Sequence, residues 1–236
     1  MKNKQKILRD LLIGMLGTAF LMGAEWLIYA LGKGNEKNGL IQTGWAKMPM
    51  WRFEISMLLC AAGVALLAVG LHAAVQVVNA SRRRGDVASI RMAKLFHLSA
   101  NAALIGFLFW HAVNCMLPVI YKSLFETSLM GAEILTTVEN VFYVFAIPFY
   151  VYRIVAYAGI TVSVVYFILV GRLRASKSML LLNPGVMLAI GYGLKFLKNP
   201  QVTDFAAAFG SFGFLFMLSG MIRPVSRKME READSY

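Results

Sequence analysis

The sequence predicts an all-α fold, a polytopic membrane helix bundle with six transmembrane helices. Of its 236 residues 58% are hydrophobic and only 15% are charged, and the mean hydropathy is +0.63. That is more apolar surface than a soluble domain can hide in one core. Six stretches approach the ~20 apolar residues that a membrane-spanning helix needs. Basic residues also concentrate in segments that would all face one side of the membrane.

The predicted spans follow one another with mostly short connections. They form a single domain over residues 1–222, and residues 223–236 are predicted to be a charged cytoplasmic tail. The first span follows a lysine-rich leader, but it has about spanning length and lacks a small-residue cleavage site, so we expect an uncleaved helix. An even number of spans places both termini on one side. The six spans are residues 11–31, 55–78, 95–120, 141–170, 179–196 and 205–222.

The charge distribution predicts the orientation. Basic residues fill segments 2–9, 82–94, 172–177 and 223–231, which all lie on the same predicted side. The positive-inside rule puts this side and both termini in the cytoplasm, which predicts a multi-pass protein of the cytoplasmic membrane. Arg82–Arg84 could contact anionic lipid headgroups or nucleic acid, but a topology signal explains the net charge of +12 better. We therefore expect membrane lipids as partners and no nucleic acid.

Three segments depart from the simple pattern of spans and short loops. Residues 32–52 are polar and then aromatic, as expected of a segment that returns to the membrane interface, and they could act as a lid. Residues 121–140 predict an amphipathic helix on the outer surface, unless they belong to the fourth helix. Residues 141–170 would form a helix about 45 Å long, too long for a ~30 Å hydrocarbon core. Pro148 thus predicts a kink or the true helix start, and the second case moves Arg153 close to the outer interface.

Glu25, inside the first span, is the main functional clue. An ionised carboxylate in hydrocarbon costs several kcal/mol unless it is paired or faces water. At ~1.5 Å per residue from the cytoplasmic end, Glu25 lies roughly 21 Å deep, His111 about 24 Å and Asn114 about 28 Å. His111 also belongs to a helical stripe whose polar members should face protein or water. The stripe comprises His97, Asn101, Ile105, Leu108, His111 and Cys115.

The matched depths predict a polar pocket under the outer headgroups, with Glu25 and His111 as a catalytic or anchoring pair. A carboxylate beside a histidine is the minimum for general acid–base chemistry. Two carboxylates with His111 would also suit a metal ion, but no metal-type cysteine spacing occurs and we predict no metal site. The structural alternative is a Glu–His or Glu–Arg contact that only fixes helix packing. The other residues predicted to bind a ligand are Trp110, Asn114, Glu139, Asn140 and Arg153.

Three classes of function fit this pocket. The first is a binder or enzyme for a lipid-like or other hydrophobic small molecule that enters from the outer leaflet. The second is a small ion-coupled transporter, although no clear inverted repeat supports it. The third is a structural or partner-binding subunit without chemistry. No His-Glu-x-x-His, Walker, Gly-x-Ser-x-Gly or intramembrane Glu-Glu motif occurs, which makes an enzyme less favoured without excluding one. The sequence specifies neither a cofactor nor an oligomeric state.

Four short motifs carry a family resemblance. They are Gly23–Tyr29 in the first span, Trp51-Arg52 before the second, Trp110-His111 in the third and Leu181–Pro184 at the start of the fifth. In this order they resemble an uncharacterised bacterial family of six-helix membrane proteins, a domain of unknown function, over nearly the whole chain. The resemblance implies members with Asp at the position of Glu25 and a His within the third helix. It implies a fold and no activity.

Overall fold

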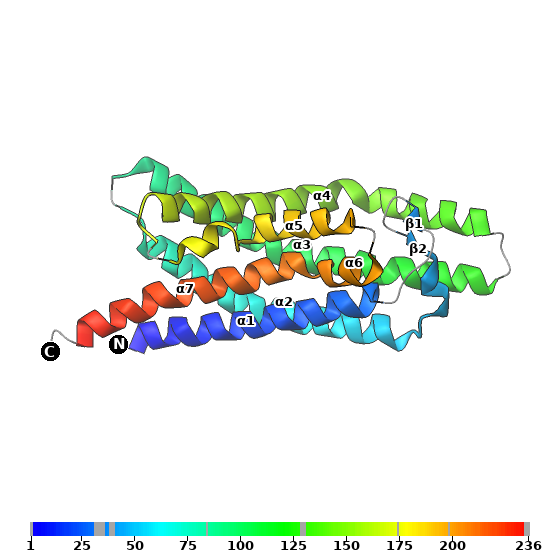
Figure 1. Cartoon of the computed structure of the whole chain (residues 1–236), viewed down its shortest axis with the longest axis horizontal. Helices are drawn as coiled ribbons and strands as arrows, with labels where there is room; N and C mark the ends of the chain where they lie inside the picture. The colour runs from blue at the N-terminus through cyan, green and yellow to red at the C-terminus, as the bar shows by residue number, and fades with distance from the viewer. Residues whose placement is uncertain are drawn as a thin grey trace.

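Helices make up nearly all of the computed structural model, which describes residues 2–30, 36–37, 41–83, 85–127, 131–173, 175–197 and 199–233. These residues contain seven α-helices (Figure 1), so the predicted all-α class is confirmed. Short elements are the hairpin β1 (Glu36–Lys37) and β2 (Ile41–Gln42) and the 3-10 helices η1 (Thr43–Lys47) and η2 (Lys177–Leu180). The α-helices are α1 (Lys2–Tyr29), α2 (Trp51–Ala80), α3 (Val87–Glu126), α4 (Gly131–Leu169), α5 (Pro184–Lys195), α6 (Pro200–Ala206) and α7 (Phe209–Ala233).

Five of the helices, α1, α2, α3, α4 and α7, are long and apolar enough to cross a membrane. The 28 residues of α1 would measure roughly 42 Å at 1.5 Å per residue, which exceeds a ~30 Å hydrocarbon core. The two ends of the chain lie at the same end of the bundle, as Figure 1 shows. The helices indicate a multi-pass membrane protein.

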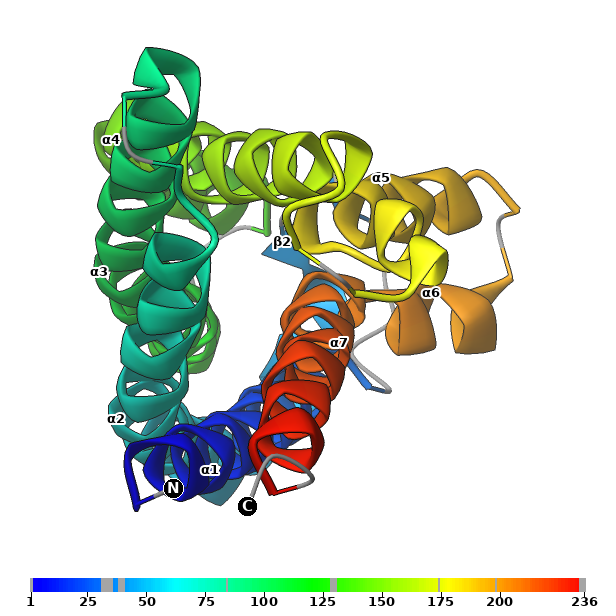
Figure 2. The same ribbon diagram turned by 90° about the vertical axis from the view of Figure 1, so that its left-hand side faces the viewer.

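The five long helices and the short α5 pack in a closed circuit. Contacts join α1 to α2, α2 to α3, α3 to α4, α4 to α5, α5 to α7 and α7 back to α1. Figure 2 views this circuit from the end at which both termini lie. Aromatic side chains cross its interior, because the Phe214 ring of α7 lies 5.2 Å from the Phe107 ring of α3 and 5.5 Å from the Tyr157 ring of α4. Three helices therefore meet at Phe214, which is fully buried.

The α1–α2 pair approaches closely through glycines. A Cβ atom added at Gly14 would overlap the Cα of Gly70, and one added at Gly17 would lie 2.6 Å from the carbonyl oxygen of Gly63. Small residues let two backbones meet in this way, and the resulting van der Waals contact is a main source of helix association in a membrane. This pair fixes the position of the segment of α1 that carries Glu25.

A second apolar core lies at the ends of α3 and α4 that are far from the chain termini. It includes Trp45 of η1 and Met48 just after η1, together with Tyr121 of α3 and Val138 of α4. The Lys122 ammonium donates hydrogen bonds to the carbonyls of Ala46 and Met48, over 3.3 and 3.0 Å. The described part of the predicted lid is thus packed on these helix ends, and its remainder lies outside the described residues.

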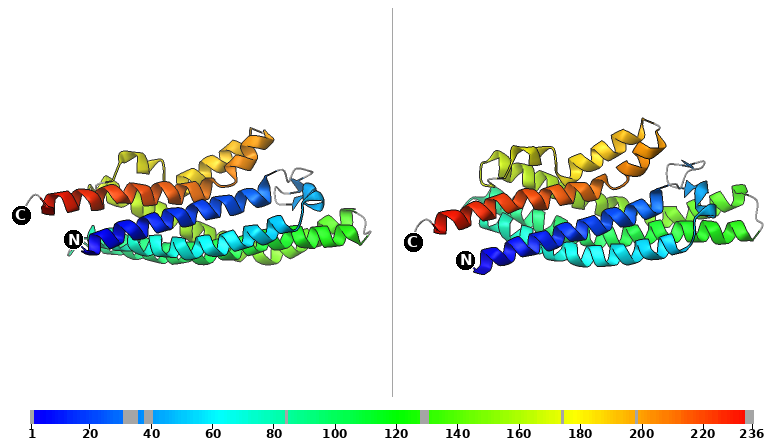
Figure 3. Two further views of the ribbon diagram at one scale, coloured as in Figure 1. Left: turned by 90° about the horizontal axis from the view of Figure 1, so that it is seen from below. Right: turned by 60° about the horizontal axis from the view of Figure 1, so that its bottom comes forward.

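The segment 121–140 does not form the predicted surface helix. Its first part completes α3, which ends at Glu126, and its second part belongs to α4, which starts at Gly131. Together they make a helical hairpin that extends away from the termini (Figure 3). The apolar side chains were misassigned because Ile134 and Val138 bury themselves in the second core rather than in the membrane surface. Pro148 accordingly lies inside α4 and does not start it.

The two last predicted spans also have different bounds. In place of a helix over 179–196, η2 is followed by α5, which has 12 residues and would measure about 18 Å. The helix starts late because the Asn183 side chain caps it by accepting a hydrogen bond from the Val186 N–H, with Pro184 in its first turn. The span 205–222 is divided between the end of α6 and α7, and α7 continues helically into the predicted tail.

The buried face of α3 differs from the predicted stripe. Ile105 and Leu108 are 54% and 42% exposed, and His97 and Asn101 are exposed as well. Successive residues of a helix are about 100° apart, so the face that α3 buries is rotated by about a quarter turn from the predicted stripe. His111 lies where the buried face and the predicted stripe overlap. The residues that α3 buries along this face are Phe96, Ala100, Ala103, Phe107, His111 and Asn114.

Candidate binding site between α1, α3 and α4

Glu25 lies in the last two turns of α1 and is half-buried against α7. The Ser211 hydroxyl, which is fully buried near the start of α7, donates a hydrogen bond to Glu25 Oε2 over 2.9 Å. A carboxylate can accept several hydrogen bonds. One oxygen of Glu25 is therefore held by the protein, while the other has capacity for a further donor.

Arg153 lies near the middle of α4 and is surrounded by aromatic rings. Its guanidinium carbon is within cation–π range of four of them, a favourable arrangement for a desolvated guanidinium. Below it, the rings of Trp110 and Phe149 are stacked with centroids 3.5 Å apart. The centroid distances from Arg153 Cζ are 5.0 Å to Tyr192, 5.4 Å to Phe149, 5.8 Å to Tyr157 and 5.9 Å to Trp110.

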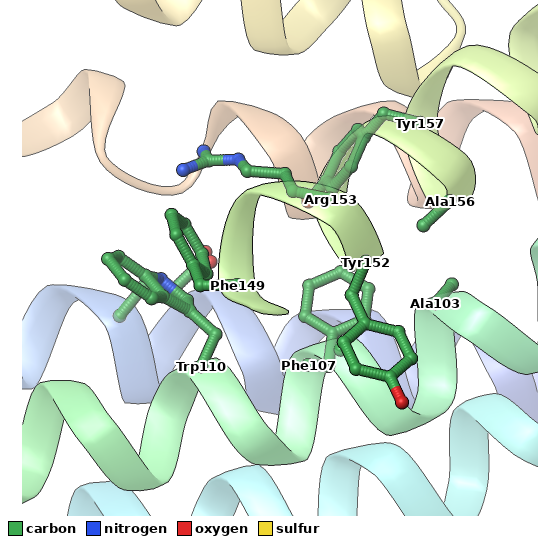
Figure 4. Close-up of a pocket in the computed structure, with 10 residues that line it drawn as sticks. Ala103, Phe107, Trp110, Phe149, Tyr152, Arg153, Ala156 and Tyr157 are labelled. Carbon is green, nitrogen blue, oxygen red and sulfur yellow. The ribbon is translucent and has the colours of Figure 1, made fainter. Parts of the chain in front are cut away.

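Glu25 and Arg153 line one cavity, shown in Figure 4. The cavity is partly open and small, with a volume of about 30 Å³. Such a space suits one or two waters or a polar group of similar size. Its walls are otherwise apolar or aromatic. The lining residues are Glu25, Ala103, Gly106, Phe107, Trp110, Phe149, Tyr152, Arg153, Ala156 and Tyr157.

The two charged side chains of the cavity do not neutralise each other by direct contact. Among the described residues the ion pairs within 4.0 Å join Arg9 to Asp10 and Arg172 to Asp86, and none joins Glu25 to Arg153. A guanidinium offers five N–H donors in a planar fork, and a carboxylate offers only acceptors. A ligand in the cavity would thus meet the N–H donors of Arg153 from α4 and the carboxylate acceptor of Glu25 from α1.

His111 serves a different set of contacts. Its Nε2 atom lies 2.8 Å from Ser56 Oγ, and the Ser56 hydroxyl donates to the carbonyl oxygen of Ala24 over 2.7 Å. A hydroxyl has one proton. Because Ser56 gives that proton to Ala24, the bond from His111 must be donated by the imidazole N–H. This chain of two hydrogen bonds connects α3, α2 and α1 and ends on the residue next to Glu25.

The other residues predicted from the sequence are distributed over several places. Trp110 and Arg153 line the cavity with Glu25, whereas His111 and Asn114 are not among its lining residues. Asn114 is buried beside the Tyr29 hydroxyl. Glu139 accepts a hydrogen bond from Tyr143 over 2.9 Å, and Asn140 is exposed; both lie in the first turns of α4.

Three contributors to the site were missed by sequence reasoning. Tyr157 stands one helical turn after Arg153, a spacing that predicts proximity, but it was assigned to an aromatic belt at the membrane interface. Tyr192 and Ser211 come from α5 and α7 and carry no signal in the sequence that connects them with α4 or α1. Among the described residues no group of three His, Cys, Asp or Glu side chains could hold a metal ion.

The helices and the charged cavity within them define a class, that of all-α proteins with several candidate membrane spans. More particularly, the chain belongs to the family of unknown function DUF6796, whose sequence profile matches residues 1–227. This confirms the resemblance to an uncharacterised family over nearly the whole chain. Searches among curated proteins and among solved structures find no match.

Proposed function

We propose that this protein is a multi-pass protein of the cell membrane that binds a lipid-like or other hydrophobic small molecule at the cavity of Glu25 and Arg153. One observation carries the proposal: a carboxylate and a guanidinium line the same cavity, within helices apolar enough to span a membrane, without pairing directly. Charged groups at such depth are costly and are mostly found where they serve a function. A ligand with a polar group would satisfy them.

The walls of the cavity favour an amphiphile over a fully polar ligand. Eight of the ten lining residues are alanine, glycine, phenylalanine, tryptophan or tyrosine, and only Glu25 and Arg153 are charged. Ligand sites typically combine such apolar walls with a few polar groups that fix orientation. The apolar part of the ligand would contact the rings, and the polar part would meet the charges.

The proposal includes six passages with both termini in the cytoplasm. Five helices supply five passages, and η2 with α5 supplies the sixth, which agrees with the position of both chain ends at one end of the bundle (Figure 1). Arg82, Arg83 and Arg172 fall in connections at that end, and Arg91 and Lys94 lie in the first turns of α3. By the positive-inside rule, this end faces the cytoplasm.

Binding is favoured over acid–base catalysis by Glu25 and His111. In a catalytic pair both side chains would have to reach the ligand, yet His111 does not line the cavity that Glu25 lines, and its Nε2 contacts Ser56. We therefore assign Glu25 and Arg153 to ligand binding, with Trp110 as part of the wall, and His111 to helix packing.

Ion-coupled transport is the second candidate function, and α5 favours it. This helix is short and begins at Asn183, which is fully buried between α4 and α7. Discontinuous helices that start inside the bundle are typical of secondary transporters. Proteoliposomes provide the test: pH-dependent uptake that requires Glu25 would favour transport, and the absence of such uptake would favour binding alone.

The binding proposal is tested by the molecules that copurify with the protein. The full chain is extracted in a mild detergent and analysed by native mass spectrometry, for the wild type, Glu25→Gln and Arg153→Gln. We expect a bound small amphiphile on the wild type and its loss from both variants. Arg91→Gln, which removes an exposed arginine near the start of α3 that does not line the cavity, is the matched control. The same bound species on all four proteins would refute the proposed site.

A further inference from the structure

The Arg153 guanidinium has hydrogen-bonding capacity that the protein leaves unused. Among the described residues its contacts are the faces of four aromatic rings, and no carbonyl, hydroxyl or carboxylate accepts a hydrogen bond from it. Ring faces stabilise the positive charge but do not satisfy the N–H groups in the plane of the fork. The guanidinium is thus held in place with its donors available.

A second cation lies near one of the four rings that surround Arg153. The Lys195 ammonium lies 5.5 Å from the centroid of the Tyr192 ring, and the Arg153 guanidinium lies 5.0 Å from the same centroid. The Glu25 carboxylate, on α1, is oriented by Ser211 and makes no ion pair with Arg153. Among the lining residues Arg153 is the one cation, so it is the group that an anion in the cavity would meet.

We propose that Arg153 binds the oxyanion headgroup of a single-chain amphiphile, either a carboxylate or a phosphate. This inference rests on the proposed function and gives its ligand a chemical class. The planar fork of arginine matches both oxyanions with two parallel charge-assisted hydrogen bonds. Glu25 lines the same cavity from α1 and can accept from the hydroxyl of a singly protonated phosphate head, whereas a carboxylate head carries no such proton.

The size of the cavity decides which part of the amphiphile enters it. The space open to the centres of water-sized molecules, about 30 Å³, admits a small oxyanion and excludes a long chain. The alkyl chain therefore leaves the cavity through its open side, at the seam between α3 and α4 where Gly106 is only half-buried. Figure 4 shows Ala103 and Ala156 facing each other across this seam.

Trp110 provides a direct readout, because it lines the cavity beneath Arg153. Bromine atoms quench tryptophan emission on contact, so brominated amphiphiles of one chain length report binding. The probes carry a carboxylate, a phosphate or a trimethylammonium head, and they are titrated onto the full chain in detergent. The chain has four tryptophans, so the signal of Trp110 is obtained by subtracting the quenching of Trp110→Phe.

We expect saturable quenching of Trp110 by the carboxylate or the phosphate probe, and binding of the trimethylammonium probe at least about tenfold weaker. The stronger of the two anionic probes identifies the source, a free fatty acid or a phosphate-bearing lipid. Arg153→Gln should weaken the anionic probes about tenfold or more, since charge-assisted hydrogen bonds are the strong ones. Arg91→Gln should leave all three titrations unchanged.

A seam variant tests the position of the alkyl chain. Gly106→Val places a branched side chain at the seam, where a Cβ already meets the Cβ of Tyr152 at 3.3 Å, whereas Gly193→Val adds the same group to a helix at a position with nothing within 4 Å. We expect weaker binding of the anionic probes only for Gly106→Val. Equal quenching in both variants would place the chain elsewhere.

The outcomes separate the two proposals. If the trimethylammonium probe quenches Trp110 as strongly as the anionic probes, the anionic class is refuted while the proposed site stands. If no probe quenches Trp110 saturably, the proposed function itself fails. The wild-type series of head groups decides the matter even if Arg153→Gln does not fold.

Discussion

Ser56 joins three helices through one hydroxyl, since it accepts from His111 of α3 and donates to the Ala24 carbonyl of α1. We expect Ser56→Ala to destabilise the protein by about 1–3 kcal/mol, because a buried imidazole N–H loses its acceptor. Thermal unfolding in detergent measures this. The matched control is Ser163→Ala, which removes an equally buried hydroxyl that bonds only Gly159 of its own helix. Equal losses in both variants would contradict the bridging role.

The ion pair of Asp86 and Arg172 predicts that the stability of the protein depends on pH. It lies at the end of the bundle that holds the termini. Their ion pair joins the connection before α3 to the one after α4. Hydrogen bonding from the Arg172 guanidinium, then from the Ser89 and Ala88 backbone, holds the pKa of the Asp86 carboxyl below its ordinary value. The stabilisation is therefore complete above the ordinary aspartate pKa of about 3.9, and it is lost as the pH falls through the lowered value.

The pH prediction is tested by unfolding wild type and Asp86→Asn at several pH values below neutrality. The asparagine keeps the oxygen that caps α3 and replaces the other oxygen, which pairs with Arg172, by an NH2 group, so the ion pair is removed while the cap is kept. We expect the wild type to be the more stable protein at neutral pH and the difference to shrink with acidification. A constant difference down to about pH 3 would show that the ion pair is not linked to the proton.

Sequence reasoning placed some residues of the site correctly and could not place others. Helical rise gives the depth of a residue along the membrane normal, and this brought Glu25 and His111 to one level. Depth says nothing of azimuth, the direction in which the side chain leaves its helix. Glu25 in fact contacts α7, through Ser211, while His111 contacts α2. These directions depend on how the helices are rotated when they pack. A single sequence does not contain that information.

At the level of elements, α5 depends on a single asparagine. The side-chain oxygen Oδ1 of Asn183 accepts hydrogen bonds from the Val186 N–H and the Thr161 hydroxyl. The side-chain Nδ2 donates to the backbone carbonyls of Met179 and Leu180. All four partners are lost in Asn183→Ala. Because the residue is fully buried, water cannot replace them, and we expect a loss of stability of about 2–4 kcal/mol from the cap and the buried groups together.

Asn199 offers a natural control for this prediction. It also precedes a proline, and it caps α6 by accepting from Gln201 and Val202. Its side chain is exposed, so Asn199→Ala should cost no more than about 1 kcal/mol. Unfolding of both variants in detergent provides the comparison. If Asn199→Ala were as damaging as Asn183→Ala, capping alone would explain α5 and the buried network would be unimportant.

The elements also show where apolar patterns stop being informative. Long apolar runs predicted α1, α2, α3, α4 and α7 well, because only a helix satisfies the backbone in hydrocarbon. The same rule failed at 121–140, where an apolar stripe faces a neighbouring helix and η1 instead of lipid. An apolar stripe indicates only that one face of a helix is shielded from water. It does not record whether protein or membrane covers that face.

For the whole molecule, the closed circuit of helices relates the number of passages to the position of the chain ends. Five passages would leave the termini at opposite ends, yet both lie at one end (Figure 1). The chain must therefore return once more, and the return falls between α4 and α7, through η2 and α5. The helix α5 has only 12 residues, and α6 follows it before α7 begins.

Cysteine accessibility tests this arrangement in intact cells. Lys177 in η2 and Leu197 after α5 are both exposed, and they bracket the short passage. With Cys60 and Cys115 replaced by alanine, we expect a membrane-impermeant maleimide to label Leu197→Cys in intact cells and Lys177→Cys only after lysis. Arg82→Cys and Thr127→Cys, at the two ends of α3, are the controls for the inner and outer sides. If Lys177→Cys and Leu197→Cys label from the same side, η2 and α5 do not cross the membrane. The six-passage topology would then be wrong, because η2 and α5 supply its sixth passage.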